Sequence, residues 1–337
     1  MRTKIRSKHK NIPVFIPHMG CPHRCVFCDQ TTISGRAAFD ETTVRAEIEA
    51  AVSTLEPDAE ADIAYFGGSF TAIDRDLMRR LLDVAQQYVD AGRVRGIRCS
   101  TRPDAVGEDI LDIFCQYSIS AIELGLQSMD DEVLLATRRG HTVAQAEDAC
   151  RRIVARGYEL VGQIMIGLPA STREKELATA KMVCDLGAGA VRIYPTVVLQ
   201  GTALAHLAKE GSYMPMTVED AVDRCADLLA IFESRNVDIM RIGLCSSDGF
   251  SAEHLYGGAY HPALGEMAYA RFYQRKMRNL LLSYSGKHPT FLVSRGKLSQ
   301  AIGQHRENTI ALCREFQLER IDVRESDLLV GTQVILS

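Results

Sequence analysis

The sequence lacks the features that mark membrane-spanning and secreted proteins. No apolar run in its 337 residues approaches the roughly 20 residues that a membrane helix requires. The first ten residues, Met-Arg-Thr-Lys-Ile-Arg-Ser-Lys-His-Lys, are polar and do not contain the apolar segment of a secretory signal. We therefore expect a cytoplasmic protein that has no membrane partner.

The sequence also has few paired cysteines, although it has ten cysteines in total. Disulfide frameworks are typical of short secreted chains, and isolated cysteines are most often small buried hydrophobic residues. Seven cysteines stand alone, without C-x-x-C spacing: Cys99, Cys115, Cys150, Cys184, Cys225, Cys245 and Cys313. The sequence therefore predicts neither a disulfide framework nor a second metal cluster.

A strong net charge is absent as well. The formal charge is -4 at pH 7, which does not by itself indicate a polyanionic partner. Both ends are nevertheless basic, because residues 1–10 form a basic arm and eleven Lys and Arg oppose six Asp and Glu from Arg271 onward. A solvated surface explains such charges equally well, so the asymmetry is compatible with an RNA partner without requiring one.

What the sequence does contain is a cysteine triplet, Cys21-Pro-His-Arg-Cys25-Val-Phe-Cys28, directly after the apolar stretch 12–16. A C-x-x-x-C-x-x-C run supplies three thiolates, whereas a 4Fe-4S cluster has four irons. One iron is then left without a protein ligand and is open to a small molecule. The triplet therefore predicts a cluster that binds its own co-substrate.

Two other interpretations of the triplet compete with the cluster. A structural zinc ion would be held if His18 or His23 completed a Cys3His set. A catalytic cysteine paired with a histidine is weaker, because nothing nearby orients such a base. The spacing favours iron and sulfur over zinc, and the rest of the chain must decide.

Short β-rich runs alternate with longer helical patterns after the triplet, as in βαβ units with a parallel sheet. We expect strands at 12–17, 61–66, 94–100, 120–124, 158–166 and 190–194, with a further candidate at 237–242. We expect helices at 41–55, 75–91, 108–117, 143–156, 172–186 and 218–234. Six strands in α/β alternation predict a partial (β/α)6 barrel, whose chemistry gathers at the C-terminal ends of its strands.

Several motifs lie in order at those strand ends. They are Gly67-Gly68-Ser69, Cys99 to Asp104, Ile122 to Ser128, Arg138-Arg139-Gly140-His141-Thr142, Gly162 to Pro169, and Arg192 to Thr196 followed by Gly201 to Leu204. Each is weak alone. With the triplet, they resemble the radical S-adenosylmethionine (SAM) enzymes of the Elongator catalytic-subunit group and, more distantly, the oxygen-independent coproporphyrinogen oxidases.

The resemblance covers about residues 10 to 245 and implies a TIM-like radical SAM barrel with two cofactors, a 4Fe-4S cluster and SAM. It also implies a low-potential electron donor of the flavodoxin or ferredoxin type. Cys21, Cys25 and Cys28 would hold the cluster and be catalytic. The implied SAM-binding residues are Phe27, Gly67, Gly68, Ser69, Ser100, Arg102, Glu123, Gln127, Arg139 and Gln163.

Two departures limit what the resemblance carries over. The Elongator subunit continues into an acetyltransferase domain, which the length of this chain does not accommodate, so we do not expect acetyl transfer. Cysteines for an auxiliary cluster are missing too, which argues against methylthiotransferase chemistry. The family's Gly-Gly-Glu-type motif appears here as Gly67-Gly68-Ser69, and a change of this kind at Ser69 is familiar in this branch of the family.

The C-terminal part predicts a small α/β appendage, with strands at 290–294 and 320–324 and helices at 297–302 and 309–316. This β-α-α-β order, with Gly303 and Arg306 at the positions of a G-x-x-G loop, resembles KH domains that bind nucleic acid. A cap over the open barrel edge is the alternative. The expected domains are an arm at 1–10, a core at 11–245, a connecting helical segment at 246–285 and the KH-like region at 286–337.

These observations predict a radical SAM enzyme that cleaves SAM to a 5'-deoxyadenosyl radical, with a tRNA base as the first candidate substrate. A radical enzyme acting on a small metabolite or a porphyrin-like ligand is the second candidate. A nucleic-acid-binding protein with a structural or redox-sensing cluster is the third. The oligomeric state cannot be read from the sequence.

Overall fold

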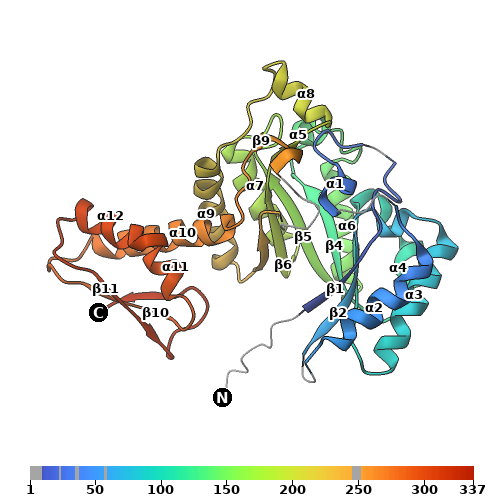
Figure 1. The fold of residues 1–337 in the computed structure, drawn as a ribbon, viewed down its shortest axis with the longest axis horizontal. Coiled ribbons are helices and arrows are strands. Elements are labelled where there is room, and N and C mark those ends of the chain that lie inside the picture. Colours follow the sequence, from blue (N-terminus) through green and yellow to red (C-terminus); the bar gives the residue numbers. More distant parts are fainter. Residues whose placement is uncertain (1–9, 23, 35–37, 57–58, 245–251) are drawn as a thin grey trace.

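The computed structural model describes residues 10–22, 24–34, 38–56, 59–244 and 252–337, and a curved sheet of seven parallel strands dominates it (Figure 1). The strands follow one another across the sheet in chain order. They are β1 (Lys10–Phe15), β2 (Ala61–Phe66), β3 (Gly96–Thr101), β4 (Ile119–Gln127), β5 (Glu159–Ile166), β6 (Ala190–Pro195) and β8 (Asp238–Ile242). This sheet is the expected partial barrel, extended by one strand because β8 pairs with β6.

Helices cover the outer face of the sheet, and their apolar side chains pack with those of the strands to form the core. They are α2 (Val44–Ser53), α3 (Arg75–Asp90), α4 (Glu108–Phe114), α6 (Val143–Ala155), α7 (Arg173–Asp185) and α9 (Val218–Ser234). In α3, for example, Met78, Leu81 and Leu82 recur at helical spacing and are almost completely buried. The Asp74 carboxylate caps this helix by accepting the Leu77 N–H at 3.0 Å.

Shorter elements extend from the C-terminal ends of the strands. They are α1 (Gln30–Ser34), α5 (Asp131–Ala136), β7 (Val197–Leu199), α8 (Ala203–Lys209) and β9 (Leu255–Gly258). Strands β7 and β9 form a separate antiparallel pair. The segment 246–285, expected to be helical, therefore contains a strand as well as helix α10 (Leu264–Leu281), because β9 finds its partner only in the folded chain.

The C-terminal region folds as a three-stranded sheet with two helices. Its elements are β10 (Thr290–Ser294), α11 (Leu298–Ile302), α12 (Glu307–Glu315), β11 (Asp322–Ser326) and β12 (Val334–Leu336). The expected β-α-α-β order is present, with β10 parallel to β11, and β12 adds an antiparallel edge that the sequence pattern did not predict. Three boundaries were wrong by two residues, since α12 begins at Glu307 and β11 spans Asp322–Ser326.

Helix α10 joins this region to the barrel. Arg275 on α10 pairs with Asp227 on α9 at 2.8 Å, and Arg278 pairs with Glu315 on α12 at 2.6 Å. In Figure 1 the strands β10 and β11 lie to one side, separated from the large sheet by α9 and α10. The region therefore lies lateral to the barrel, on the side of α9 and α10.

Among the described residues, no helix combines the length and the apolar character needed to cross a bilayer. Most of the basic arm, residues 1–9, and Cys245 lie outside the described residues. The expectations placed on them are therefore not addressed by the fold.

Candidate cluster and cofactor site

The three cysteines of the triplet lie on the loop that connects β1 to α1. Backbone hydrogen bonds fix this loop from two sides: the Val26 N–H donates to the Thr137 carbonyl at 3.1 Å, and the Val26 carbonyl accepts the Leu204 N–H at 2.8 Å. Thr137 ends α5 and Leu204 lies in α8. Elements far apart in the sequence thus hold the loop at the C-terminal end of the barrel.

The candidate metal ligands of the loop are three cysteine thiols. Burial and the neighbouring thiols of Cys25 and Cys21 raise the pKa of Cys28 to about 12, and burial also raises the pKa of Cys21. Among the described residues, no three Cys, His, Asp or Glu side chains are arranged to hold a metal ion, and this includes the three thiols of the triplet. The case for a cluster with one open iron therefore rests on the number and spacing of the three thiols.

Of the two histidines that the zinc alternative invokes, His18 has one ring nitrogen in a hydrogen bond. His18 Nε2 accepts the backbone N–H of Gln30 at 2.9 Å, and the His18 N–H donates to Gln30 Oε1 at 3.1 Å. The imidazole nitrogen nearest the start of α1 is therefore already used by the backbone. The other histidine, His23, lies outside the described residues.

The glycine pair after β2 packs directly against the start of the cysteine loop. A Cβ on Gly68 would lie 2.2 Å from the Met19 carbonyl oxygen and 2.8 Å from the Ile16 carbonyl oxygen. Gly67 has a φ of +105°, which disfavours other residues. Small size is therefore required here by the chain itself, whatever a ligand also requires.

We expect Gly68→Ala to lower the amount of cluster that the protein retains, because its methyl group must displace Met19, two residues before Cys21. Overpacking of this kind costs about 1–3 kcal/mol. Gly189→Ala is the control, since a Cβ there meets only the Glu159 side chain at 3.6 Å. The check is iron and sulfide content after anaerobic reconstitution; equal content in both variants would show that the loop tolerates the displacement.

Hydroxyl groups tie the end of β2 to the end of β3. Ser69 Oγ lies 2.9 Å from Thr101 Oγ1 and accepts the Arg102 N–H at 3.3 Å. Thr71 Oγ1 lies 2.6 Å from Thr101 Oγ1. Ser69 is completely buried, so its hydroxyl positions the segment that carries Arg102.

Two buried arginines flank the cysteine loop. Arg139 donates from Nη1 to Cys25 Sγ at 3.3 Å and from Nη2 to the Gly125 carbonyl at 2.5 Å. Arg102 forms a two-pronged pair with Asp104, at 2.9 Å for each bond, and donates to the Arg139 carbonyl at 2.5 Å. Although burial raises the pKa of Asp104, the Arg102 hydrogen bonds hold it below its usual range.

Buried polar atoms without partners gather around the same loop. Arg102 Nη1 and Arg139 Nε are buried and make no hydrogen bond with the described residues, and the buried His141 ring beside them approaches only the Leu126 backbone, outside ordinary hydrogen-bond geometry. Burial and the charges of Arg139 and Arg102 lower the pKa of His141 to about 3, so its ring is neutral at physiological pH. Buried polar groups are normally hydrogen-bonded. A polar ligand in the site would supply the hydrogen-bond partners that these buried nitrogens lack.

A second polar layer lies deeper inside the barrel. The Glu123 carboxylate is completely buried and accepts two hydrogen bonds from Arg192, at 2.8 and 3.3 Å, and one from Gln163 Nε2 at 3.3 Å. Arg98 lies 3.5 Å from Glu123 and 3.8 Å from Asp62, which are both fully buried. Charged side chains from β2, β3, β4 and β6 thus form one network.

The structure sorts the predicted SAM-binding residues into three sets. Ser69, Arg102 and Arg139 lie together beside the cysteine loop, and Gln127, with a φ of +64°, ends β4 close to Gly125 and Arg139. Glu123 and Gln163 belong to the deeper network, and Ser100 is paired in register with Glu123. The others lie along the chain entering or forming the cysteine loop: Gly67 and Gly68 pack against its start, and Phe27 packs against the apolar group that contains Val26 and Leu204.

The sequence motifs did not identify Arg98, Asp62 and Thr71 as members of the site. A signal for two of them was present, because Asp62 and Arg98 are charged residues inside otherwise apolar strands. A charge in a strand that is buried on both faces requires a partner, which predicts an inward-facing ionic network.

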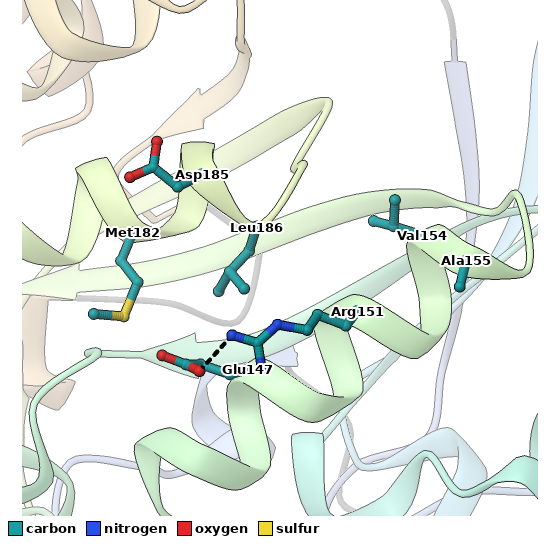
Figure 2. Close-up of a pocket in the computed structure, with 7 residues that line it drawn as sticks. All are labelled: Glu147, Arg151, Val154, Ala155, Met182, Asp185 and Leu186. Carbon is teal, nitrogen blue, oxygen red and sulfur yellow. Dashed lines mark hydrogen bonds and ion pairs between the residues drawn. The ribbon is translucent and has the colours of Figure 1, made fainter.

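One well-formed surface groove is remote from this chemistry. It lies between α6 and α7 and is lined by Glu147, Arg151, Val154, Ala155, Met182, Asp185 and Leu186 (Figure 2). Its charges include the Arg151–Glu147 pair at 2.7 Å, one helical turn apart. It contains none of the predicted site residues.

Comparison with known proteins identifies the architecture. The Radical SAM superfamily model matches residues 15–183, and a model of the radical SAM C-terminal domain matches residues 189–274. Archaeal Elp3 from Methanocaldococcus infernus, solved with an N-terminal deletion, has the same fold with a TM-score of 0.64, 24% identity and coverage of 80% of this chain and 64% of that chain.

Two relatives from Methanocaldococcus jannaschii are each 28% identical. One is an uncharacterized protein matched over 68% of this chain and 74% of its own length. The other is a tRNA uridine(34) acetyltransferase matched over 60% of this chain and 45% of its own length, so the chain spans less than half of that enzyme. These matches confirm the Elongator-like resemblance. By the family model that covers half of its residues, the chain belongs to the radical SAM superfamily, whose enzymes use a 4Fe-4S cluster and SAM.

Proposed function

We propose that this enzyme cleaves SAM reductively at a 4Fe-4S cluster held by Cys21, Cys25 and Cys28, and that the product radical modifies a tRNA base. When bound, the cluster and SAM supply a 5'-deoxyadenosyl radical, which removes hydrogen from the substrate. The observation that carries the proposal is the set of unpartnered buried nitrogens on Arg102, Arg139 and His141 around the three thiols.

The side chains around the loop have separate tasks in this proposal. Arg139 donates to Cys25 Sγ and so stabilises the thiolate form that a cluster requires. Arg102, fixed by Asp104, keeps Nη1 free for an anionic group such as the SAM carboxylate. The neutral His141 ring offers one donor and one acceptor to a ligand without adding charge.

The direct test is anaerobic reconstitution followed by measurement of 5'-deoxyadenosine, with and without total tRNA. We expect SAM cleavage with a strong reductant, and faster cleavage when tRNA is present. Reconstituted protein that holds a full cluster yet forms no 5'-deoxyadenosine would contradict the proposal.

RNA as the substrate is supported by the relatives and by the appendage. A relative named tRNA uridine(34) acetyltransferase aligns with 60% of this chain, and the appendage presents exposed cations. Arg306 and Arg314 are exposed and make no ion pair with a described residue. Gly303, by contrast, is buried, and its Cβ would meet Glu307 and Asn308, so it packs against α12 rather than facing a ligand.

We expect the double variant Arg306→Gln, Arg314→Gln to bind tRNA more weakly and with a shallower salt dependence. Removing one phosphate-binding side chain lowers the slope by about 0.9 for duplex and about 0.7 for single strands. Arg278→Gln is the control, because this exposed arginine is already paired with Glu315. Equal slopes for wild type and double variant, measured by titration at several salt concentrations, would remove the appendage from the RNA-binding surface.

One observation favours the second candidate, a small anionic metabolite. Arg241 on β8 is paired in register with Arg192 on β6, is half-buried, and makes no ion pair or hydrogen bond with the described residues. Its charge also reaches the Tyr194 phenol, where it opposes the effect of burial on the pKa. A carboxylate that stimulates 5'-deoxyadenosine formation when tRNA does not would favour this candidate.

A further inference from the structure

A groove runs along the cysteine loop on the side of α5. Its described lining residues are Pro22 and Arg24 from the loop, Asp131, Leu134 and Leu135 from α5, and Arg138, Gly140, His141 and Thr142 from the following segment. This surface, called the loop groove here, is distinct from the groove between α6 and α7 in Figure 2. Of its lining residues, only the buried His141 has a task in the proposed chemistry.

The loop groove carries positive charge that the protein does not neutralise. Arg24 and Arg138 are exposed, and neither guanidinium forms a hydrogen bond or ion pair with a described residue. Asp131 is the one acidic side chain in the described lining. Its carboxylate accepts the Val143 N–H at 2.8 Å, which fixes it at the start of α6. The groove therefore attracts an acidic partner.

Apolar side chains lie between these charges. Leu135 is 81% exposed, whereas the neighbouring Leu134 is buried. Exposed Pro22 adds to the same surface. An apolar centre with charged residues at its rim is typical of a protein interface, whereas the described lining offers no aromatic ring on which a nucleobase would stack.

The position of the groove links it to the cluster. Pro22 and Arg24 are the covalent neighbours of Cys21 and Cys25. Arg138 precedes Arg139, whose guanidinium lies 3.3 Å from Cys25 Sγ. Only the thickness of the loop would therefore separate a redox centre docked in the groove from the cluster.

From this combination we propose that the loop groove docks an acidic, low-potential one-electron carrier protein, which reduces the cluster. The proposal rests on the cluster of the proposed function and names its electron partner's site. One electron leaves the reduced flavin or iron-sulfur centre of the carrier and enters the cluster, and no covalent bond forms or breaks. Transient redox complexes bury less than about 1,200 Å², so a local groove of this kind is sufficient.

The test is the rate at which the cluster-loaded protein is reduced by an acidic flavodoxin in its reduced form. In the double variant Leu135→Ser, Arg138→Glu we expect this second-order rate to fall by about 10-fold or more at low salt, since steering accounts for factors of 10 to about 1,000. Titration of cluster-free protein with oxidised flavodoxin should show weaker binding. Reduction by dithionite, which needs no docking, should stay within about twofold of wild type.

The groove in Figure 2 supplies a matched control. Val154→Ser, Arg151→Glu makes the same two kinds of change on an exposed helix face that does not adjoin the cysteine loop. Its new contact with Glu147 is a like-charge pair that costs only about 0.2–0.5 kcal/mol. We expect this variant to be reduced by flavodoxin as fast as wild type.

Each outcome decides the proposal. Unchanged flavodoxin reduction in the loop-groove variant overturns it, and so does an equal loss in the control variant. Loss of tRNA binding with normal flavodoxin reduction also overturns it and assigns the groove to RNA. Because cluster reduction is the readout, a protein that fails to cleave SAM still yields a clear answer about the groove.

Discussion

Replacing Cys21, Cys25 or Cys28 by alanine is expected to abolish the 4Fe-4S cluster and all SAM cleavage. In the proposed cluster each thiolate would bind a different iron, so the loss of one thiol leaves an iron without its protein ligand. Reconstituted wild type should contain about four irons per chain, and each variant should contain little. The measurement is iron and sulfide content together with the EPR spectrum of the reduced protein, with and without SAM.

Cys184→Ala is the matched control for these variants. Cys184 is a free, half-buried cysteine on α7, so its removal tests the loss of a thiol away from the loop. It should retain the cluster and its response to SAM. A triplet variant that keeps a full cluster, or a wild-type protein that binds one zinc ion and no iron under anaerobic conditions, would refute the assignment.

Helices and strands were predictable where the local sequence pattern and the tertiary packing favour the same element. The helix expected at 218–234 has these bounds in the structure, because Thr217 caps it and its apolar residues recur at helical spacing. The strand expected at 290–294 was likewise correct. Strands β7 and β9 were not predicted, since a three- or four-residue strand is fixed by its partner rather than by its own pattern.

The sequence motifs predicted which residues lie in the site, but they did not predict what each of these residues does there. Arg102, Arg139 and the cysteine loop were expected near one another, and the structure brings them together. Gly68 was expected to leave room for a ligand, yet the nearest atom that requires its small size is the Met19 carbonyl. The sequence motif identifies a position that requires a small residue, but it does not show which neighbouring atom imposes this requirement.

Glu123 is a second residue whose role in the structure could not be predicted from its sequence motif. The resemblance implies that it contacts SAM, whereas its carboxylate accepts two hydrogen bonds from Arg192 and one from Gln163. Arg98 also lies 3.5 Å from it. These contacts need no ligand, so they indicate a role in the stability of the barrel that the motif alone does not reveal.

Glu123→Ala is accordingly expected to destabilise the protein even when SAM and cluster are absent. Removing one partner of a buried ion pair costs about 3–5 kcal/mol, because Arg192 and Arg98 would keep their charges in a site with little water. This is a large share of the roughly 5–15 kcal/mol that stabilises a typical protein. The measurement is urea unfolding of the cluster-free protein.

The surface pair Glu147 and Arg151 provides the comparison for Glu123, because Glu147→Ala breaks an exposed pair worth about 0–1 kcal/mol. Glu123→Gln should lie between the two, since it keeps the shape and one acceptor oxygen but removes the charge that balances Arg192. If Glu123→Ala unfolds at the wild-type urea concentration and loses only SAM affinity, Glu123 is a ligand contact and not a structural counter-ion. The order Glu123→Ala, Glu123→Gln, Glu147→Ala from least to most stable is therefore the result that the buried network requires.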